Sequence, residues 1–124
     1  MTFESQISFL YYKNLAKACE FYEKIFGFDL VIDQGWAKIY KVTNGALLGL
    51  VDETKGHFNW QKEKTIMITL VTSSIDEVDE WYAKLKKLDV KLVFEPRDVE
   101  EINIRCFLFE DPEGYVVEIQ HFLK

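Results

Sequence analysis

The stretch ISFLYYKNLAKACEFYEKI, residues 7–25, decides the fold, because its pattern returns in the second half of the chain. It opens with an apolar, strand-like run at 7–12 and continues through Asn14 into an amphipathic stretch at 15–25. Asparagine is a common N-cap, since its side chain accepts a hydrogen bond from an unpaired amide of the first helical turn. The stretch therefore predicts a strand, a capped turn and a helix.

The second copy begins with a strand-like run at 66–72, followed by Ser74 and a helical stretch at 75–88. Ser74 stands 60 residues after Asn14 and is also a good N-cap type. An internal repeat is sought first because it shows how many times one supersecondary unit is built. We therefore expect two modules of the same design.

Three further β-like segments follow each predicted helix, bounded by turn signals such as Asn44-Gly45 and Asp111-Pro112-Glu113-Gly114, and by Glu95-Pro96-Arg97 within the second half. The segments are 28–32, 36–42 and 46–51 in the first half, and 91–94, 102–109 and 115–121 in the second. Each half thus reads β-α-β-β-β.

The predicted fold is α+β, a single domain of two tandem modules, residues 1–51 and 65–124, with a polar linker at 52–64. One helix covers only one face of a four-stranded sheet, so the uncovered faces need partners. We expect a curved eight-stranded mixed sheet with the helices outside and a concave interior available to a ligand.

Length and composition exclude several classes of protein. The 124 residues suit one domain, and 48% hydrophobic with 29% charged residues is typical of a packed globule. The net charge of −6 disfavours nucleic-acid binding, because it repels phosphates. Cys19 and Cys106 stand far apart and form no disulfide framework. No targeting or membrane-spanning stretch is seen, so we expect a cytoplasmic protein without a membrane partner.

Two motifs, on top of the repeat, resemble a known family. They are Asn14-Leu15 with Phe21-Tyr22 and Phe26-Gly27-Phe28 in the first half, and Asp111-Pro112-Glu113-Gly114 with Tyr115 to Ile119 in the second. The doubled module is similar to the vicinal oxygen chelate superfamily, which includes glyoxalase I, bleomycin-resistance proteins, fosfomycin-resistance enzymes and extradiol dioxygenases.

The resemblance implies where a metal would bind, because enzymes of this superfamily hold a divalent ion with His, Glu or Gln from the first and last strand of each module. The matching positions are Ile7, Gly49, Met67 and Glu118. Only Glu118 is a ligand for such metals, since Ile7 and Gly49 offer no donor and a thioether suits soft copper(I). A slip of one residue would bring Gln6 in place of Ile7. We expect no metal and no other cofactor.

Strand alternation around these positions predicts a mainly apolar, aromatic site with one acid. Glu118 could be a general base, could bind a ligand's amine, or could be a structural carboxylate paired with Arg105. The aromatic candidates could stack on a planar or cationic ligand, or could only fill a core. The predicted ligand-binding residues are Ile7, Phe9, Tyr11, Trp36, Tyr40, Gly49, Met67, Thr69, Arg105 and Glu118, with Glu118 as the catalytic candidate.

The function that this pattern favours is a metal-independent small-molecule-binding protein resembling the bleomycin-resistance branch, with a cationic or aromatic ligand. The alternative is a lyase, isomerase or dioxygenase of the superfamily that uses Glu118 as base or metal ligand. A third is a regulator that binds a peptide or metabolite. Whether the chain is an enzyme stays open, although a typical metal-dependent glyoxalase is disfavoured. The resemblance also implies a homodimer, for which an open sheet edge gives a physical reason.

Overall fold

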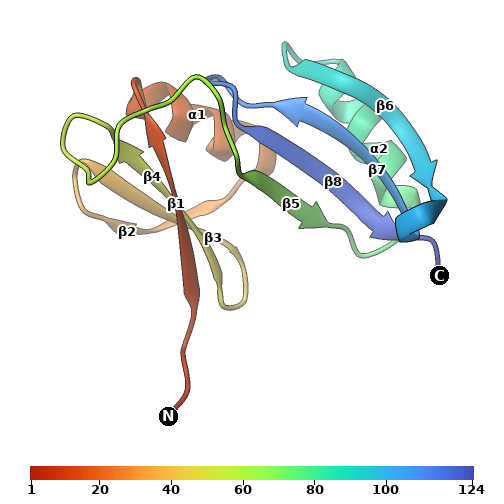
Figure 1. Ribbon diagram of the computed structural model, residues 1–124, viewed down its shortest axis with the longest axis horizontal. Helices are drawn as coiled ribbons and strands as arrows, with labels where there is room; N and C mark the ends of the chain where they lie inside the picture. The colour runs from red at the N-terminus through yellow and green to blue at the C-terminus, as the bar shows by residue number, and fades with distance from the viewer. The chain divides into compact units, whose positions relative to one another are not determined.

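The computed structural model describes residues 1–124, which divide into two compact units, Met1–Gln61 and Lys62–Lys124. In the first unit (Figure 1), four strands hydrogen-bond in the order β1-β4-β3-β2, with β1 parallel to β4 and the other pairs antiparallel. The elements are β1 (Gln6–Tyr12), α1 (Leu15–Phe26), β2 (Asp29–Asp33), β3 (Ala37–Thr43) and β4 (Ala46–Asp52).

The second unit repeats this plan, with strand order β5-β8-β7-β6 and β5 parallel to β8. Its elements are β5 (Met67–Val71), α2 (Asp76–Lys86), β6 (Lys91–Val99), the short 3₁₀ helix η1 (Glu100–Ile102), β7 (Ile104–Glu110) and β8 (Val116–Phe122). The predicted α+β class and the two β-α-β-β-β modules are confirmed. The eight strands form two four-stranded mixed sheets, one in each unit.

The two helix starts differ, although the sequence predicted the same cap for both. Asn14 caps α1, since its side chain accepts a hydrogen bond from the Lys17 amide at 3.1 Å. At α2 the N-cap residue is Ile75, which makes no side-chain cap, and the Ser74 hydroxyl lies 3.3 Å from the Glu77 carboxylate. The prediction for Ser74 is wrong because its hydroxyl contacts a side chain instead of a backbone amide.

The predicted turn at Glu95-Pro96-Arg97 is also wrong. These residues belong to β6, which runs on to Val99 with irregular pairing to β7 between Phe94 and Arg97. Proline is tolerated in an edge strand with such irregularities, because no ladder bond is needed from its nitrogen. The chain reverses at η1, where Asn103 adopts the left-handed conformation with φ 59°.

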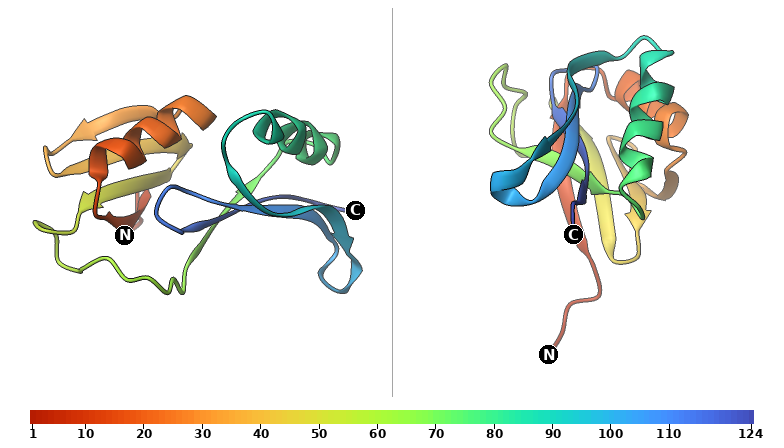
Figure 2. Two further views of the ribbon diagram at one scale, coloured as in Figure 1. Left: turned by 90° about the horizontal axis from the view of Figure 1, so that it is seen from above. Right: turned by 90° about the vertical axis from the view of Figure 1, so that its right-hand side faces the viewer.

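Each helix packs on one face of its own sheet (Figure 2), and this packing forms the core of each unit. In the first unit the helix α1 places Ala18, Tyr22 and Ile25 against the sheet, and strand residues such as Leu10 and Leu50 are fully buried. In the second, Val78 and Leu85 of α2 are buried with the strand residues Phe107, Phe109, Val117 and Ile119. Burying such side chains stabilises the fold by about 1.5–3 kcal/mol each.

None of the helices combines the length and the apolar character that a membrane crossing requires.

Candidate functional site

Each sheet has a face that turns away from its own helix, called here the helix-free face. In the first unit the pairing register Phe9 to Gly49 and Tyr11 to Val51 places Ile7, Phe9 and Tyr11 on this face. Gln6 falls in the opposite alternation. The register therefore decides between the two alternatives for the first metal position and selects Ile7.

The ring of Phe9 fills the space above Gly49. A β-carbon built on Gly49 would come within 2.3 Å of Cδ1 and 2.4 Å of Cε1 of this ring, far inside van der Waals contact. The ring itself is 42% exposed. Glycine at position 49 is thus explained by a close aromatic contact, and no side chain at this position fits beside Phe9 as it lies.

The segment that follows β4 packs on the same helix-free face. The Phe58 ring meets the Tyr11 ring edge-on, with 5.5 Å between centroids, and His57 meets Phe58 in the same way at 4.6 Å. A β-carbon on Gly56 would lie 2.5 Å from Val51 and 2.7 Å from Tyr11. Residues 52–61 of the predicted linker therefore belong to the first unit.

Tyr40, one of the predicted aromatic residues, does not lie with Phe9 and Tyr11. Tyr40 is fully buried on the helix side, where its hydroxyl donates a 2.5 Å hydrogen bond to the carboxylate of Glu23 on α1. Burial, with hydrogen bonds to Cys19 and Glu23, raises the pKa of Tyr40 far above its usual range. Trp36 lies just before β3 and is 47% exposed. The prediction of Tyr40 as a stacking surface is corrected, because its ring and hydroxyl belong to the core.

The helix-free face of the second unit carries the predicted acid. Glu118 pairs in register with Thr69 on β5 and with Leu108 on β7, so these three side chains share one face. Glu118 is only 8% exposed, and its carboxylate accepts a 2.8 Å hydrogen bond from the Thr69 hydroxyl. The Cys106 thiol is its other hydrogen-bonding neighbour. Met67 stands two residues before Thr69 on β5, which puts it on the same face, and it is 46% exposed.

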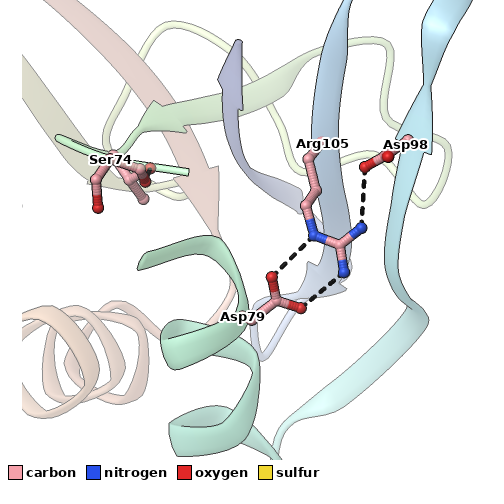
Figure 3. Close-up of polar contacts among 5 residues, drawn as sticks. Ser74, Asp79, Asp98 and Arg105 are labelled. Carbon is pink, nitrogen blue, oxygen red and sulfur yellow. Dashed lines mark hydrogen bonds and ion pairs between the residues drawn. The ribbon is translucent and has the colours of Figure 1, made fainter. Parts of the chain in front are cut away.

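Arg105 does not pair with Glu118 (Figure 3). Its guanidinium donates two hydrogen bonds of 2.8 Å to Asp79 on α2 and one of 2.9 Å to Asp98 on β6. These bonds hold the pKa of Asp79 below its usual range. The prediction that Arg105 contributes to the site is corrected, because the β7 register places it on the helix side with His121.

Arg97 is a cation that the sequence analysis missed. It pairs in register with Cys106, which places it on the helix-free face with Glu118. Its guanidinium carbon lies 3.7 Å from the centroid of the Phe94 ring, a cation–π contact. The sequence around Pro96 predicted a turn, so Arg97 was not assigned to a strand. If Pro96 is taken as a residue of an edge strand, the predicted strand extends to Arg97.

The residues present do not fit the superfamily's usual metal. No three His, Cys, Asp or Glu side chains gather into a metal-binding group. Of the four expected positions, Ile7 and Met67 provide no hard donor, and the space at Gly49 is taken by Phe9. Glu118 already accepts a hydrogen bond from Thr69. A single carboxylate binds a divalent ion only weakly, since stable sites need several oxygen or nitrogen ligands.

Residues 5–119 match the family model of the Glyoxalase/Bleomycin resistance protein/Dioxygenase superfamily. The chain belongs to this superfamily. Among curated proteins it is 33% identical over 105 residues to "Metallothiol transferase FosB" of Lysinibacillus sphaericus (strain C3-41), covering 85% of this chain and 72% of that protein. It is 29% identical over 106 residues to the protein of the same name from Staphylococcus epidermidis, covering 86% and 74%.

Solved structures of the superfamily share the fold. A glyoxalase/bleomycin resistance protein/dioxygenase from Nocardioides matches with a TM-score of 0.80 at 23% identity, covering 100% of this chain and 85% of that one. Lactoylglutathione lyase from Agrobacterium tumefaciens matches with a TM-score of 0.77 at 20% identity, covering 93% and 90%. At such identities these superfamily members show a shared fold, and function has to be argued from the site.

Proposed function

We propose that this superfamily member is a metal-independent small-molecule-binding protein. Its ligand donates a hydrogen bond to the Glu118 carboxylate or forms an ion pair with it. The observation that supports this is a nearly buried carboxylate on the helix-free face of the second sheet. A buried carboxylate without a cationic partner is costly unless its lone pairs are satisfied. Thr69 and Cys106 provide donors, and a carboxylate has about four lone-pair sites, so acceptor capacity remains for a ligand.

The surroundings of Glu118 favour a ligand with apolar or aromatic surface and an amine or other N–H donor. Met67 and Leu108 flank the carboxylate on the same face and supply apolar contact. A charge-assisted hydrogen bond in such surroundings is stronger than one in water. The chain's net charge of −6 adds a general attraction for cations.

A second candidate is an enzyme, favoured by the 33% identity to a protein named metallothiol transferase. In this reading, which includes the lyase, isomerase and dioxygenase chemistries of the superfamily, Glu118 would act as the base. Thr69 would hold one carboxylate oxygen while the other received the proton. The unsuitable residues at three metal positions weigh against the metal-dependent versions of these reactions.

Assembly into a homodimer is a further part of the proposal. The strands β1, β2, β5 and β6 each end a sheet, and unpaired strand edges invite a partner. Light scattering after gel filtration tests it, and a monomer at all concentrations up to the millimolar range would contradict it.

The first test is metal content, followed by melting temperature with and without Mn, Fe, Ni and Zn salts. A bound metal raises the melting temperature by mass action. We expect no stoichiometric metal and no specific shift. A metal at one equivalent would overturn the proposal and direct attention to transferase, lyase and dioxygenase assays.

The second test is a calorimetric screen of cationic and aromatic small molecules, bleomycin-like ones first, against the protein and its Glu118→Gln variant. We expect binding that weakens by about tenfold or more in Glu118→Gln, the loss of one charge-assisted bond. Glu20→Gln, an exposed change of equal charge on α1, is the matched control and should bind normally. The proposal would be contradicted if no compound in the panel binds, or if a compound binds the Glu118→Gln variant as tightly as the unchanged protein.

A further inference from the structure

We infer that the helix-free face of the second unit selects dipolar ligands, whose donor end binds Glu118 and whose oxyanion end binds Arg97. This inference rests on the proposed function and adds a second, oppositely charged contact to it.

The sheet register places the two charged side chains on one face with a small residue between them. Arg97 on β6 stands opposite Cys106 on β7, and Cys106 stands opposite Gln120 on β8. Glu118 lies two residues before Gln120, which keeps it on the same face. Adjacent strands lie about 4.8 Å apart and residues rise about 3.4 Å along a strand, so two strand spacings and a two-residue offset put the backbones of Arg97 and Glu118 roughly 12 Å apart.

Both charges act on the Cys106 thiol from opposite sides. Burial raises the pKa of this thiol, the neighbouring Glu118 raises it further, and Arg97 lowers it. The carboxylate of Glu118 thus hydrogen-bonds at Cys106, and Arg97 stands opposite Cys106 in the strand register, so the two charges lie on either side of this residue. Cys106 is only 3% exposed, so its small side chain forms the floor between the charges.

Neither Arg97 nor Glu118 takes part in the ion pairs Lys38–Asp33, Lys91–Glu110, Arg105–Asp79 and Arg105–Asp98. The contrast with Arg105 is informative. Two carboxylates engage the guanidinium of Arg105 on the helix side. Arg97 lies on the ring face of Phe94, which fixes the cation and leaves its in-plane N–H groups for an acceptor.

The chemistry of the two groups defines the ligand. A guanidinium fork binds a carboxylate, phosphate or phosphonate through two parallel hydrogen bonds. A carboxylate accepts from an ammonium or other N–H group. A molecule that carries one of each, joined by a short apolar or aromatic spacer, satisfies both groups and contacts the apolar surface around Met67 and Leu108.

The test uses three probes with the same ring. They are 4-(aminomethyl)benzoate, which carries both charges, its methyl ester, which keeps only the ammonium, and 4-methylbenzoate, which keeps only the carboxylate. Calorimetry is performed with the full chain and with Arg97→Gln, Glu118→Gln and Lys62→Gln. Lys62→Gln removes an exposed positive charge from the same unit and is the matched control. Circular dichroism and melting confirm that each variant is folded.

We expect the dipolar probe to bind about tenfold or more tightly than either singly charged probe, the effect of one charge-assisted contact. Arg97→Gln should abolish the advantage of the dipolar probe over the ester and leave ester binding unchanged. Glu118→Gln should abolish its advantage over 4-methylbenzoate. Lys62→Gln should change neither.

The inference is overturned if the ester binds as tightly as the dipolar probe, if none of the three probes binds, or if Lys62→Gln acts like Arg97→Gln. In the first case Glu118-dependent binding of the ester would leave the proposed function intact. If the wider panel of cationic and aromatic molecules also fails to bind, the proposed function fails as well, so the two failures are distinguishable.

Discussion

The ring of Phe9 lies directly over Gly49, so closely that a β-carbon at residue 49 would come within 2.3 Å of it. The contact joins neighbouring residues of the parallel pair β1 and β4. It replaces a position where enzymes of the superfamily place a metal ligand. The first sheet therefore offers an aromatic surface at this point.

Gly49→Ala is expected to destabilise the protein by about 1–3 kcal/mol, the usual cost of overpacking, because Phe9 must leave its position. Urea unfolding of Gly49→Ala, Phe9→Ala and the double variant measures the coupling between the two residues. In the Phe9→Ala background the cost of Gly49→Ala should largely disappear. An equal cost in both backgrounds would show that the ring is not the obstacle.

Tyr40→Phe is expected to lower the free energy of unfolding by about 2 kcal/mol, because it removes a buried hydrogen bond to the Glu23 carboxylate. Tyr82→Phe, at a ring that contacts Phe107 in the second unit, is the control and should cost little. Urea denaturation at pH 7 measures both. A loss in Tyr40→Phe no larger than in Tyr82→Phe would contradict the role of this bond.

The same bond predicts a dependence on alkaline pH. The folded state raises the pKa of Tyr40 above its ordinary value of 10. The stabilisation is therefore fully present below pH 10 and is lost as pH rises above it, because the unfolded chain releases the proton first. The stability difference between wild type and Tyr40→Phe should shrink above pH 10, and a constant difference would refute this.

Asp79→Asn is expected to lower stability by about 1 kcal/mol at pH 7, since Asp79 is half exposed and its pair with Arg105 is partly screened. The pKa of Asp79 is lowered from 3.8 by its hydrogen bonds with Arg105. The stabilisation is present above pH 3.8 and is lost as pH falls below it. Urea unfolding between pH 7 and pH 2.5 measures this, with exposed Glu80→Gln on α2 as control. A pH-independent difference for Asp79→Asn would contradict an ionic origin.

Alkylation of Cys106 tests its contact with Glu118. Burial and the nearby carboxylate raise the pKa of this thiol, so iodoacetamide should react slowly with the folded protein at pH 8. Glu118→Gln should accelerate the reaction severalfold by removing the negative charge, while Thr69→Val, which keeps the carboxylate, should not. Peptide mass spectrometry follows Cys106 and Cys19 separately, and Cys19 should be unaffected. Equal rates in wild type and Glu118→Gln would show that the charge does not reach the thiol.

Local sequence signals predicted most elements of the fold. The strand-to-helix boundary at Asn14 was correct because the cap is a short-range interaction between Asn14 and the Lys17 amide. The same reasoning failed at Ser74, whose hydroxyl contacts Glu77. It also failed at Pro96, because an edge strand tolerates proline where its pairing is irregular. Such cases depend on pairing with residues that are distant in sequence.

The sequence by itself determined the repeat, the α+β class and the alternation that places Phe9, Thr69 and Glu118 on the helix-free faces, because these follow from the period-2 and helical patterns. Only the tertiary structure decided that Arg105 pairs with Asp79, that Tyr40 bonds to Glu23, and that Arg97 shares a face with Glu118. In the strands β3 and β7 both alternate sets of side chains are apolar or aromatic enough to fit either face. The face that each set occupies is fixed by the helix that packs on the sheet and by the register with neighbouring strands.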